Sequence, residues 1–301
     1  MIDPCDFIDG LKLAGINFAT GVPDSLLKDI CAYITTSFDQ ENHIISTNEG
    51  SALSFAAGYY LSSGKPALVY MQNSGLGNII NPITSLFHSQ VYGIPALLLI
   101  GWRGEIDYET GIQIKDEPQH KKQGACTKDL LETLDIDYKI IDSNTRNIKS
   151  IIKKLKEKTL NSQSPVAILV KKNSFSSYKL QENYQNYSLT REEVIFNIVN
   201  MIPSNIPIVS TTGMASRELF EIRKKENISH ERDFLTVGGM GHASQIAAGI
   251  AFSRPKNKVL CLDGDGALLM HSGSLAISAG CNNLIHVLLN NEAHDSVGGQ
   301  P

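Results

Sequence analysis

Near the end of the chain, two groups of polar residues directly follow apolar runs. "KVLCLDGDG" places Asp265 between Gly264 and Gly266, and "NLIHVLLNN" ends on Asn291. Carboxylate and amide oxygens are ligands that Mg²⁺ prefers, and this ion often shares its coordination with phosphate oxygens. The glycines let a ligand approach the backbone closely, and a helix starting at Ala267 would offer free N–H groups to an anion. The pattern therefore predicts a site for magnesium and a diphosphate.

This prediction depends on the segment between the two groups. Residues 267–280 have the length of a crossover helix, and the apolar runs on either side are typical of buried parallel strands. A right-handed crossover makes such strands neighbours and brings their carboxyl ends to one edge of the sheet, where open α/β sheets bind ligands. Asp265 and Asn291 should therefore converge. The alternative is that Asp265 caps a helix and the asparagines form a turn, and the one-crossover spacing argues against it.

The rest of the chain shows the same alternation of short apolar runs and longer helical patterns. With 301 residues the chain exceeds the usual size of one domain. The alternation predicts an α/β fold with two doubly wound parallel-sheet domains. The expected strands are "INFAT", "HIIST", "PALVYM", "PALLLIG", "DYKIID" and "PVAILVK" in the first half, and "IPIVST", "DFLTVG", "KVLCLDG" and "NLIHVLLNN" in the second.

Three helices are expected at particular positions: one capped by Asp24 and running through Tyr33, a small-residue helix after Glu49, and a basic amphipathic helix over 144–159. A further helix should start from Thr190.

A polar segment separates the two halves. "KNSFSSYKLQENYQNYS" is rich in Ser, Asn and Tyr and has no apolar period, which is typical of a linker. We therefore expect a first domain over 1–172, a linker over 173–188 and a second domain over 189–301. Only four strands are expected in the second domain, so we expect that domain to be incomplete.

Composition and charge exclude several classes of function. A formal net charge of -4 gives no general attraction to nucleic acid or to an anionic membrane. The five cysteines are far apart and include no CxxC pair, which argues against a disulfide framework, a zinc site or an iron–sulfur cluster. No apolar run approaches the ~20 residues of a membrane span, and the first ten residues carry acids where a signal peptide has bases. We expect a cytoplasmic protein.

The GDG…NN element resembles the cofactor motif of enzymes that use thiamin diphosphate (ThDP). The resemblance implies that Asp265, Asn291 and the backbone carbonyl of Ala293 hold a Mg²⁺ ion. It also implies a glutamate that contacts N1′ of the aminopyrimidine, and Glu49 matches it because it directly follows a strand and opens a small-residue helix. An acid in the first turn of a helix can instead serve only the helix dipole. Together with GDG…NN, the catalytic role is favoured.

Two more stretches match the same family. Met240 occupies the position of the bulky residue that bends the cofactor, and the Gly238 carbonyl would accept a hydrogen bond from the pyrimidine amine. Met240 could otherwise fill a gap in a core. Thr212, Gly213 and the N–H groups of the helix that follows would hold the diphosphate. For this last stretch, an ordinary strand-to-helix turn is an equally good interpretation.

Beyond these motifs, the chain resembles the phosphonopyruvate decarboxylase family, to which sulfopyruvate decarboxylases are closely related. The stretches that carry this resemblance are "GVPDSLLK", "MQNSGLGNIINPITSL", "GWRGE", "KDEPQHKKQG" and "NNEAHDSVGGQP", which together span residues 21–301. The resemblance implies ThDP- and Mg²⁺-dependent decarboxylation of 3-phosphonopyruvate to phosphonoacetaldehyde and CO₂, a step of phosphonate biosynthesis. The cofactor supplies the difficult chemistry. The protein must bind a dianionic head group and donate protons.

The loops after "PALLLIG" offer candidates for binding that head group. Arg103 and Lys121 are basic, and Arg suits bidentate binding of a phosphonate or sulfonate. His120 is a candidate catalytic residue beside them, and Ser25 could add an anion contact from a helix N-terminus. The alternatives are solvated loop positions for the first three and simple helix capping for Ser25.

Two polar residues directly after the metal motif are candidates for proton transfer. His294 and Asp295 could relay protons to the product. A polar pair beside a metal loop has little structural use, which favours the catalytic role.

The resemblance also implies a homo-oligomer in which Glu49 of one subunit faces Asp265 of another. Two other classes of function stay open. One is a ThDP oxidoreductase subunit, which would need CoA, an electron acceptor and usually cluster-binding cysteines or a partner chain. The other is a truncated fragment without catalytic activity.

Overall fold

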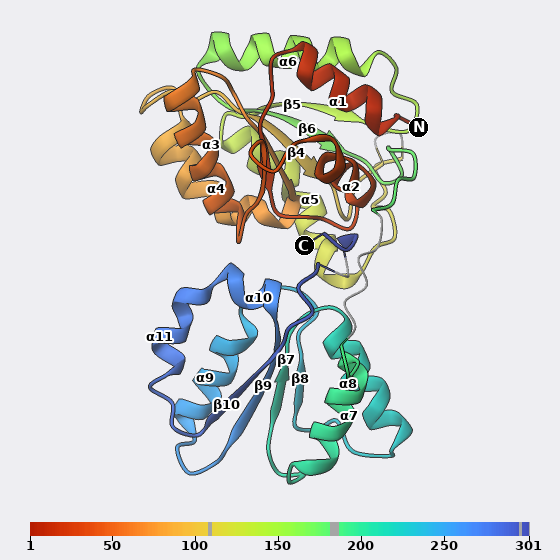
Figure 1. Cartoon of the computed structure of the whole chain (residues 1–301), viewed down its shortest axis with the longest axis vertical. Coiled ribbons are helices and arrows are strands. Elements are labelled where there is room, and N and C mark those ends of the chain that lie inside the picture. Colours follow the sequence, from red (N-terminus) through yellow and green to blue (C-terminus); the bar gives the residue numbers. More distant parts are fainter. Residues whose placement is uncertain (108–109, 181–186, 295–296, 301) are drawn as a thin grey trace. The chain divides into compact units, whose positions relative to one another are not determined.

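The computed structural model describes residues 1–107, 110–180, 187–294 and 297–300. The chain forms two compact units, of which unit 1 contains Met1–Gln181 with Val297–Gln300 and unit 2 contains Glu182–Ser296 with Pro301. In each unit, helices pack on the faces of a parallel sheet (Figure 1). The predicted α/β class with two parallel sheets is confirmed. None of the described helices is long and apolar enough to cross a membrane.

Six of the described strands form the sheet of unit 1, in the order β2-β1-β3-β4-β6-β5 and all parallel. Each of the six apolar runs expected in this half overlaps a strand. The central strands β4 and β6 are buried along their whole length, because both faces of the sheet are covered. The strands are β1 (Ala19–Gly21), β2 (His43–Ile45), β3 (Leu68–Gln72), β4 (Leu97–Gly101), β5 (Asp137–Ile141) and β6 (Val166–Val170).

Helices cover both faces of this sheet. Alternate residues of β4 enter two different cores, Leu97 and Leu99 on one face and Leu98 and Ile100 on the other. The first core contains side chains of α1 (Pro4–Leu13), α2 (Lys28–Ser37) and α6 (Ile148–Ser162). The second contains side chains of α3 (Glu49–Ser63), α4 (Leu76–Pro82), η2 (Ile83–Phe87) and α5 (Pro118–Thr133).

Two predicted helix starts in unit 1 are wrong. The helix expected after Asp24 begins only at Lys28, because the buried Asp24 carboxylate accepts hydrogen bonds from Leu27 N (3.3 Å) and Gln72 Nε2 (2.6 Å) in a bend before it. The helix expected from residue 144 begins at Ile148. Asp142 Oδ1 accepts from the amide of Asn144 at 2.9 Å, and this local turn competes with a helix.

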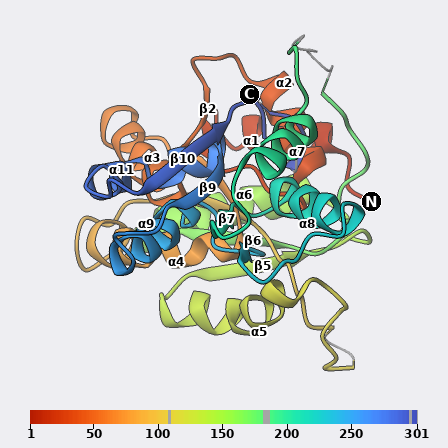
Figure 2. The same ribbon diagram turned by 90° about the horizontal axis from the view of Figure 1, so that it is seen from below.

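Unit 2 has a four-stranded parallel sheet in the order β10-β9-β7-β8. Figure 2 shows α7 and α8 on one face of this sheet and α9 on the other, in agreement with two separate apolar clusters. The helix predicted from Thr190 is present as α7, and a capping box formed by Thr190 and Glu193 starts it. The elements are α7 (Arg191–Met201), β7 (Ile208–Ser210), α8 (Met214–Lys225), β8 (Asp233–Leu235), α9 (Ala243–Ser253), β9 (Val259–Gly264) and β10 (Leu284–Leu289).

Strands β9 and β10 are parallel neighbours, as one crossover predicts, and Leu289 pairs with Gly264 at their carboxyl ends. The connection is not the single helix expected over 267–280. It consists of α10 (Asp265–Met270), a 3-10 turn (Ser272–Ser274) and α11 (Leu275–Ser278). The Ser-Gly-Ser turn favours this break, because serine and glycine have low helix propensity. The first helix also begins at Asp265 rather than at Ala267.

Candidate active site

Glu49 lies in unit 1 at the first position of α3, just beyond the end of β2. Asn48 caps this helix by accepting a hydrogen bond from Ser51 N at 2.9 Å. The Glu49 side chain is buried, with 5% of the residue exposed, and its Oε2 accepts from Asn78 Nδ2 at 2.7 Å. One strong hydrogen bond from α4 therefore orients a buried carboxylate at a helix N-terminus.

Gly75 makes room for this carboxylate. A Cβ atom at Gly75 would lie 2.5 Å from Glu49 Cγ and 2.6 Å from Glu49 Cδ and Oε1. Gly75 and Asn78 were not individual candidates, although both belong to the stretch "MQNSGLGNIINPITSL". No residue pattern along the chain singles out either one, and only the fold shows that both lie against Glu49.

Arg103 follows β4 and is held by Asp116. Its Nε and Nη2 atoms donate to the two oxygens of Asp116 at 2.9 and 2.5 Å, and its Nη1 donates to Ser25 Oγ at 2.6 Å. The hydrogen bond from Arg103 holds the pKa of the Asp116 carboxyl far below its usual range. Asn73 holds the backbone of Arg103, because its amide donates to Arg103 O (2.9 Å) and accepts from Arg103 N (3.2 Å). Arg103 and Ser25, both predicted from the sequence, thus meet.

His120 and Lys121 lie in the first turns of α5, the helix that follows this loop. His120 is buried and its Nδ1 lies 3.0 Å from Asp116 Oδ1, so it belongs to the same hydrogen-bonded group. Lys121 is exposed, and its backbone carbonyl accepts from Gln113 Nε2. Asp116 was not predicted as a site residue, although it links Arg103 to His120.

In unit 2, Asp265 and Asn291 lie together at the carboxyl ends of β9 and β10. Asp265 Oδ2 accepts from Asn291 N at 3.2 Å and from Glu292 N at 2.8 Å, while Oδ1 accepts from Gly266 N at 2.7 Å. The expectation that these motifs converge is therefore met by the geometry. An oxygen-only set of a carboxylate, an amide and nearby carbonyls fits Mg²⁺.

The two asparagines also form a turn, which was the alternative interpretation. Asn290 Oδ1 accepts from Glu292 N at 3.1 Å and Asn291 Oδ1 accepts from Ala293 N at 3.4 Å. Glu292 has a φ of 57°, in the left-handed region. An amide oxygen has two lone pairs, so Asn291 can support this turn and still bind a metal ion.

Met240 and His294 meet over Gly266. A Cβ atom at Gly266 would lie 2.8 Å from His294 Cε1 and 3.3 Å from Met240 Cε. Burial lowers the pKa of His294, and the nearby Asp265 opposes this. Gly238 lies in the bend just before Met240. Asp295, the second predicted proton donor, lies outside the described residues.

The turn between β7 and α8 contains Thr212 and Gly213. Gly213 has φ 92° and ψ -137°, a conformation that favours glycine, at the N-cap of α8. Thr211 was not a candidate, but its Oγ1 is buried and has no hydrogen-bond partner among the described residues. A buried hydroxyl without a hydrogen-bond partner is costly unless a ligand forms the missing hydrogen bond. Together with the helix N-terminus, this hydroxyl makes the turn suitable for a diphosphate.

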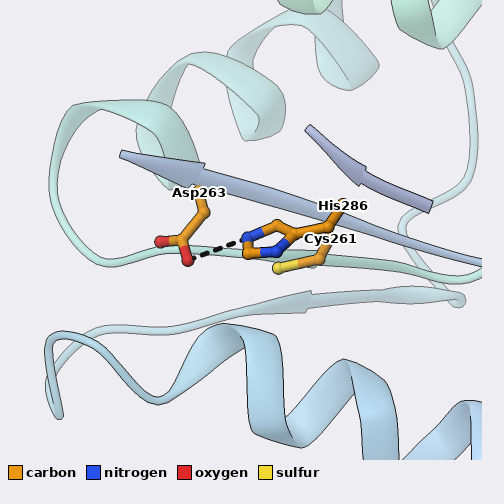
Figure 3. Close-up of side chains that lie close together, drawn as sticks. All are labelled: Cys261, Asp263 and His286. Atoms are coloured by element: carbon orange, nitrogen blue, oxygen red, sulfur yellow. Dashed lines mark hydrogen bonds and ion pairs between the residues drawn. The ribbon is translucent and has the colours of Figure 1, made fainter. Parts of the chain in front are cut away.

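Another cluster of polar side chains lies in strands β9 and β10, ahead of the Asp265 and Asn291 motifs in the sequence. Figure 3 shows Cys261, Asp263 and His286 pointing toward one another, with His286 Nε2 3.1 Å from Asp263 Oδ2. One potential ligand atom from each residue lies within 4.8 Å of the others. Burial raises the pKa of the Cys261 thiol well above its usual value, so the thiol stays protonated at neutral pH. We therefore interpret the group as a buried Asp–His pair beside a packed thiol.

Two family models match the chain. Residues 6–129 match the N-terminal TPP binding domain of thiamine pyrophosphate enzymes, and residues 209–301 match their C-terminal TPP binding domain. The chain belongs to the thiamine pyrophosphate enzyme family, and the family inferred from its motifs is confirmed.

Within this family, the chain is similar to decarboxylases of two short anionic 2-oxo acids. It is 31% identical to a phosphonopyruvate decarboxylase of Streptomyces viridochromogenes in an alignment that is 325 positions long with its gaps and covers 100% of this chain and 76% of the relative. It is 28% identical to a sulfopyruvate decarboxylase of Methanosarcina acetivorans, covering 97% and 76%. A sulfopyruvate decarboxylase subunit alpha of Methanococcus maripaludis is 39% identical and covers 52% of this chain and 87% of its own length.

Proposed function

We propose that this thiamine pyrophosphate enzyme is a ThDP- and Mg²⁺-dependent decarboxylase that converts 3-phosphonopyruvate to phosphonoacetaldehyde and CO₂, which would place it in phosphonate biosynthesis. The observation that carries the proposal is the 31% identity to phosphonopyruvate decarboxylase along the whole chain. The buried, oriented Glu49 and the pairing of Asp265 with Asn291 support it, because they supply both sets of groups that the cofactor requires.

The domain roles follow from where these groups lie. Residues 1–172 would bind the pyrimidine through Glu49, and residues 189–301 would bind the diphosphate, with residues 173–188 as the linker. In the second domain, Asp265, Asn291 and the Ala293 carbonyl would hold Mg²⁺. The residues proposed to contact the cofactor itself are Thr212, Gly213, Gly238, Met240, Gly264, Gly266 and Ala267.

When bound, ThDP would supply the electron sink for cleavage of the bond between the carboxylate and the 2-oxo carbon. The Glu49 carboxylate would share a proton with the pyrimidine nitrogen. The hydrogen bond from Asn78 keeps this carboxylate in place for that role. Met240 would present an apolar contact that excludes water. His120, His294 and Asp295 are the proposed proton donors, and Arg103, Lys121 and Ser25 the proposed substrate contacts.

Sulfopyruvate decarboxylation is the second candidate function. The 28% identity to sulfopyruvate decarboxylase over 97% of the chain supports it. Both substrates carry a tetrahedral anion on C3, so both would use the same basic residues. We also propose that the chain works as a homo-oligomer in which Glu49 and Asp265 of one active site come from different subunits.

The test is a decarboxylation assay of the full chain with ThDP and Mg²⁺. Release of CO₂ and of the aldehyde should be measured for phosphonopyruvate and sulfopyruvate in parallel, without an electron acceptor. We expect turnover of phosphonopyruvate with a higher kcat/KM. Preference for sulfopyruvate would select the second candidate. Turnover of neither substrate by folded protein with bound ThDP would exclude both, and CoA-dependent dye reduction would instead identify an oxidoreductase.

A further inference from the structure

Unit 1 contains a cavity of about 580 Å³ beside Arg103. Its walls come from segments that follow the carboxyl ends of β1, β4 and β6, and from the chain just before α5. This is the edge where parallel sheets bind ligands, and the volume lies within the range of roughly 300–1,000 Å³ typical of small-molecule sites. The hydrogen-bond donors and cations in its wall include Ser25, Lys28, Trp102, Arg103, Lys115 and Lys172, and its acids are Asp29, Glu105 and Asp116.

The acids in the cavity wall are already paired. Asp116 holds Arg103 through both oxygens. Glu105 is buried, accepts from Lys172 N at 3.0 Å and lies 3.6 Å from Lys171 Nζ. Asp29 accepts from Tyr178 N at 3.1 Å.

The lysines in the wall are not paired in this way. Among the described residues, no carboxylate forms an ion pair with Lys28, Lys115 or Lys172. The cavity therefore has an excess of positive charge: four cations, Lys28, Arg103, Lys115 and Lys172, line it against three acids, and of these acids Asp116 and Glu105 are paired with Arg103 and Lys171.

Arg103 and Ser25 are pre-positioned as donors toward this space. Asp116 fixes the plane of the guanidinium, and Nη1 donates one of its two hydrogens to Ser25 Oγ at 2.6 Å. Because Ser25 Oγ accepts this bond, its own hydroxyl hydrogen is left for another acceptor. The second hydrogen of Nη1 is left as well. Two neighbouring donors that are fixed before a ligand arrives suit the oxygens of one tetrahedral anion.

We propose that this cavity is the binding site for the anionic head group of the substrate, a phosphonate or sulfonate on C3 of the 2-oxo acid. Arg103 and Ser25 contact its oxygens directly. Because Asp116 balances the charge of Arg103, Lys115 and Lys172 supply the positive charge that attracts the anion. The inference rests on the proposed function, because it names how that substrate is recognised. It adds the two lysines as determinants of specificity and assigns Asp116 as the positioning residue for Arg103.

The lysines bear on the choice between the two head groups. A guanidinium paired with a carboxylate is close to neutral as a unit, so it offers hydrogen-bond geometry more than charge. A phosphonate with two negative charges gains more from unpaired lysines than a sulfonate with one. Loss of Lys115 or Lys172 should therefore weaken phosphonate binding more than sulfonate binding.

The chain has a built-in reporter for this site. Trp102 is its one tryptophan, it lines the cavity, and its indole Nε1 donates to Gly124 O at 2.9 Å. The experiment is a titration of the full chain, without ThDP, with 3-phosphonopropionate, 3-sulfopropionate and butyrate. Tryptophan emission and calorimetry should be recorded on the same samples, so that binding without a change in emission is also detected.

We expect saturable binding of the two tetrahedral anions and none of butyrate. Lys172→Gln and Lys115→Gln should each weaken 3-phosphonopropionate binding about three- to tenfold. Ser25→Ala should weaken both anions. Lys153→Gln, an exposed lysine on α6, is the matched control and should leave the affinity unchanged.

Absence of saturable binding to the folded wild type would overturn the inference, and so would equal affinity in the Lys115, Lys172 and Lys153 variants. The assay does not depend on turnover. Anion binding without decarboxylation of either substrate would refute the proposed function and leave the site intact. Decarboxylation with a KM that the lysine variants leave unchanged would refute the role of the lysines at the anion site and leave the proposed function intact.

Discussion

At the scale of single residues, the role of Glu49 rests on a buried carboxylate held by Asn78. Glu49→Gln keeps the size of the side chain and removes its charge. We predict a fall in kcat of about 10²-fold or more with a thermal unfolding midpoint close to that of the wild type, because general acid–base groups contribute roughly that much. Steady-state assays and thermal melts measure the two effects. Glu41→Gln, at an exposed acid, is the control. Normal turnover by Glu49→Gln would show that the Glu49 carboxylate does not have the proposed catalytic role.

Gly75 provides a sharper test of the same site. In Gly75→Ala the new methyl group would lie 2.5 Å from Glu49 Cγ, so the carboxylate must move. We predict a large loss of kcat. Gly77→Ala, in the same stretch of chain, is the matched control, since no atom lies within 4 Å of its new methyl group. It should retain activity and be no less stable. Equal activity of the two variants would show that the position of Glu49 does not matter.

His43 predicts a dependence of stability on pH. Burial lowers the pKa of His43 from 6.5 to about 4, and its Nε2 lies 2.8 Å from Tyr70 OH. The folded chain keeps this histidine neutral, whereas the unfolded chain takes up a proton below pH ~6.5. The free energy of unfolding should therefore fall as the pH drops from about 6.5 toward 4, with a loss of about 2 kcal/mol by pH 5 from this group.

Urea unfolding at pH 7 and pH 5 measures this loss. His43→Gln removes the titrating ring, so the variant should lose less stability over the same interval. Equal losses in the wild type and the variant would show that His43 does not contribute.

At the scale of elements, the β9–α10–β10 unit holds the proposed metal site, and the Asp263–His286 pair ties its two strands together. Asp263 is fully buried, with 0% exposed. His286→Ala would leave this carboxylate without its histidine partner. We predict a loss of about 2–4 kcal/mol in the free energy of unfolding, because only the Oδ1 atom of the buried carboxylate would keep a donor, Gly264 N at 3.0 Å, and a buried oxygen that loses its partner is costly. Chemical denaturation followed by far-UV circular dichroism measures it. An unchanged free energy would contradict the account of this pair.

The strands could be predicted from the sequence because each coincides with a short apolar run, whereas the helices have longer segments with helical periodicity. The convergence of Asp265 and Asn291 followed from one right-handed crossover. The helix starts were harder, since local turns such as the one at Asp142 override helical periodicity. The break in the crossover at residues 272–274 was also missed.

The partners that position the site residues were beyond sequence reasoning for a different reason. Asn78 contacts Glu49 across 29 positions, and Arg103 meets Ser25 across 78. Such contacts depend on how strands are ordered in the sheet, which a pattern along the chain does not specify. Arg103 and Ser25 were named from residue type and their place after a strand, but Asp116, Gly75 and Thr211 had no such signal.

At the scale of the whole molecule, the proposed active site would combine Glu49 of one subunit with Asp265 of another. We predict that Glu49→Gln and Asp265→Asn are each inactive alone and that co-expression restores activity. A mixed dimer would contain one site with both native residues, so the mixed dimer isolated with two tags should have about half of the wild-type activity, and an unfractionated, randomly paired mixture about a quarter. Assays of the co-purified protein, with each chain carrying a different affinity tag, measure this. Absence of restored activity in a confirmed mixed dimer would contradict a site shared between subunits.

The central claim is that this chain activates ThDP through Glu49. The measurement that tests it most directly is the rate at which the C2 proton of bound ThDP exchanges with deuterium, followed by acid quench and NMR without any substrate. The account predicts exchange far faster than for free ThDP, lost in Glu49→Gln and retained in Gly77→Ala. Exchange on wild-type protein with saturating ThDP and Mg²⁺ that is no faster than in solution, or equally fast in Glu49→Gln, would contradict it.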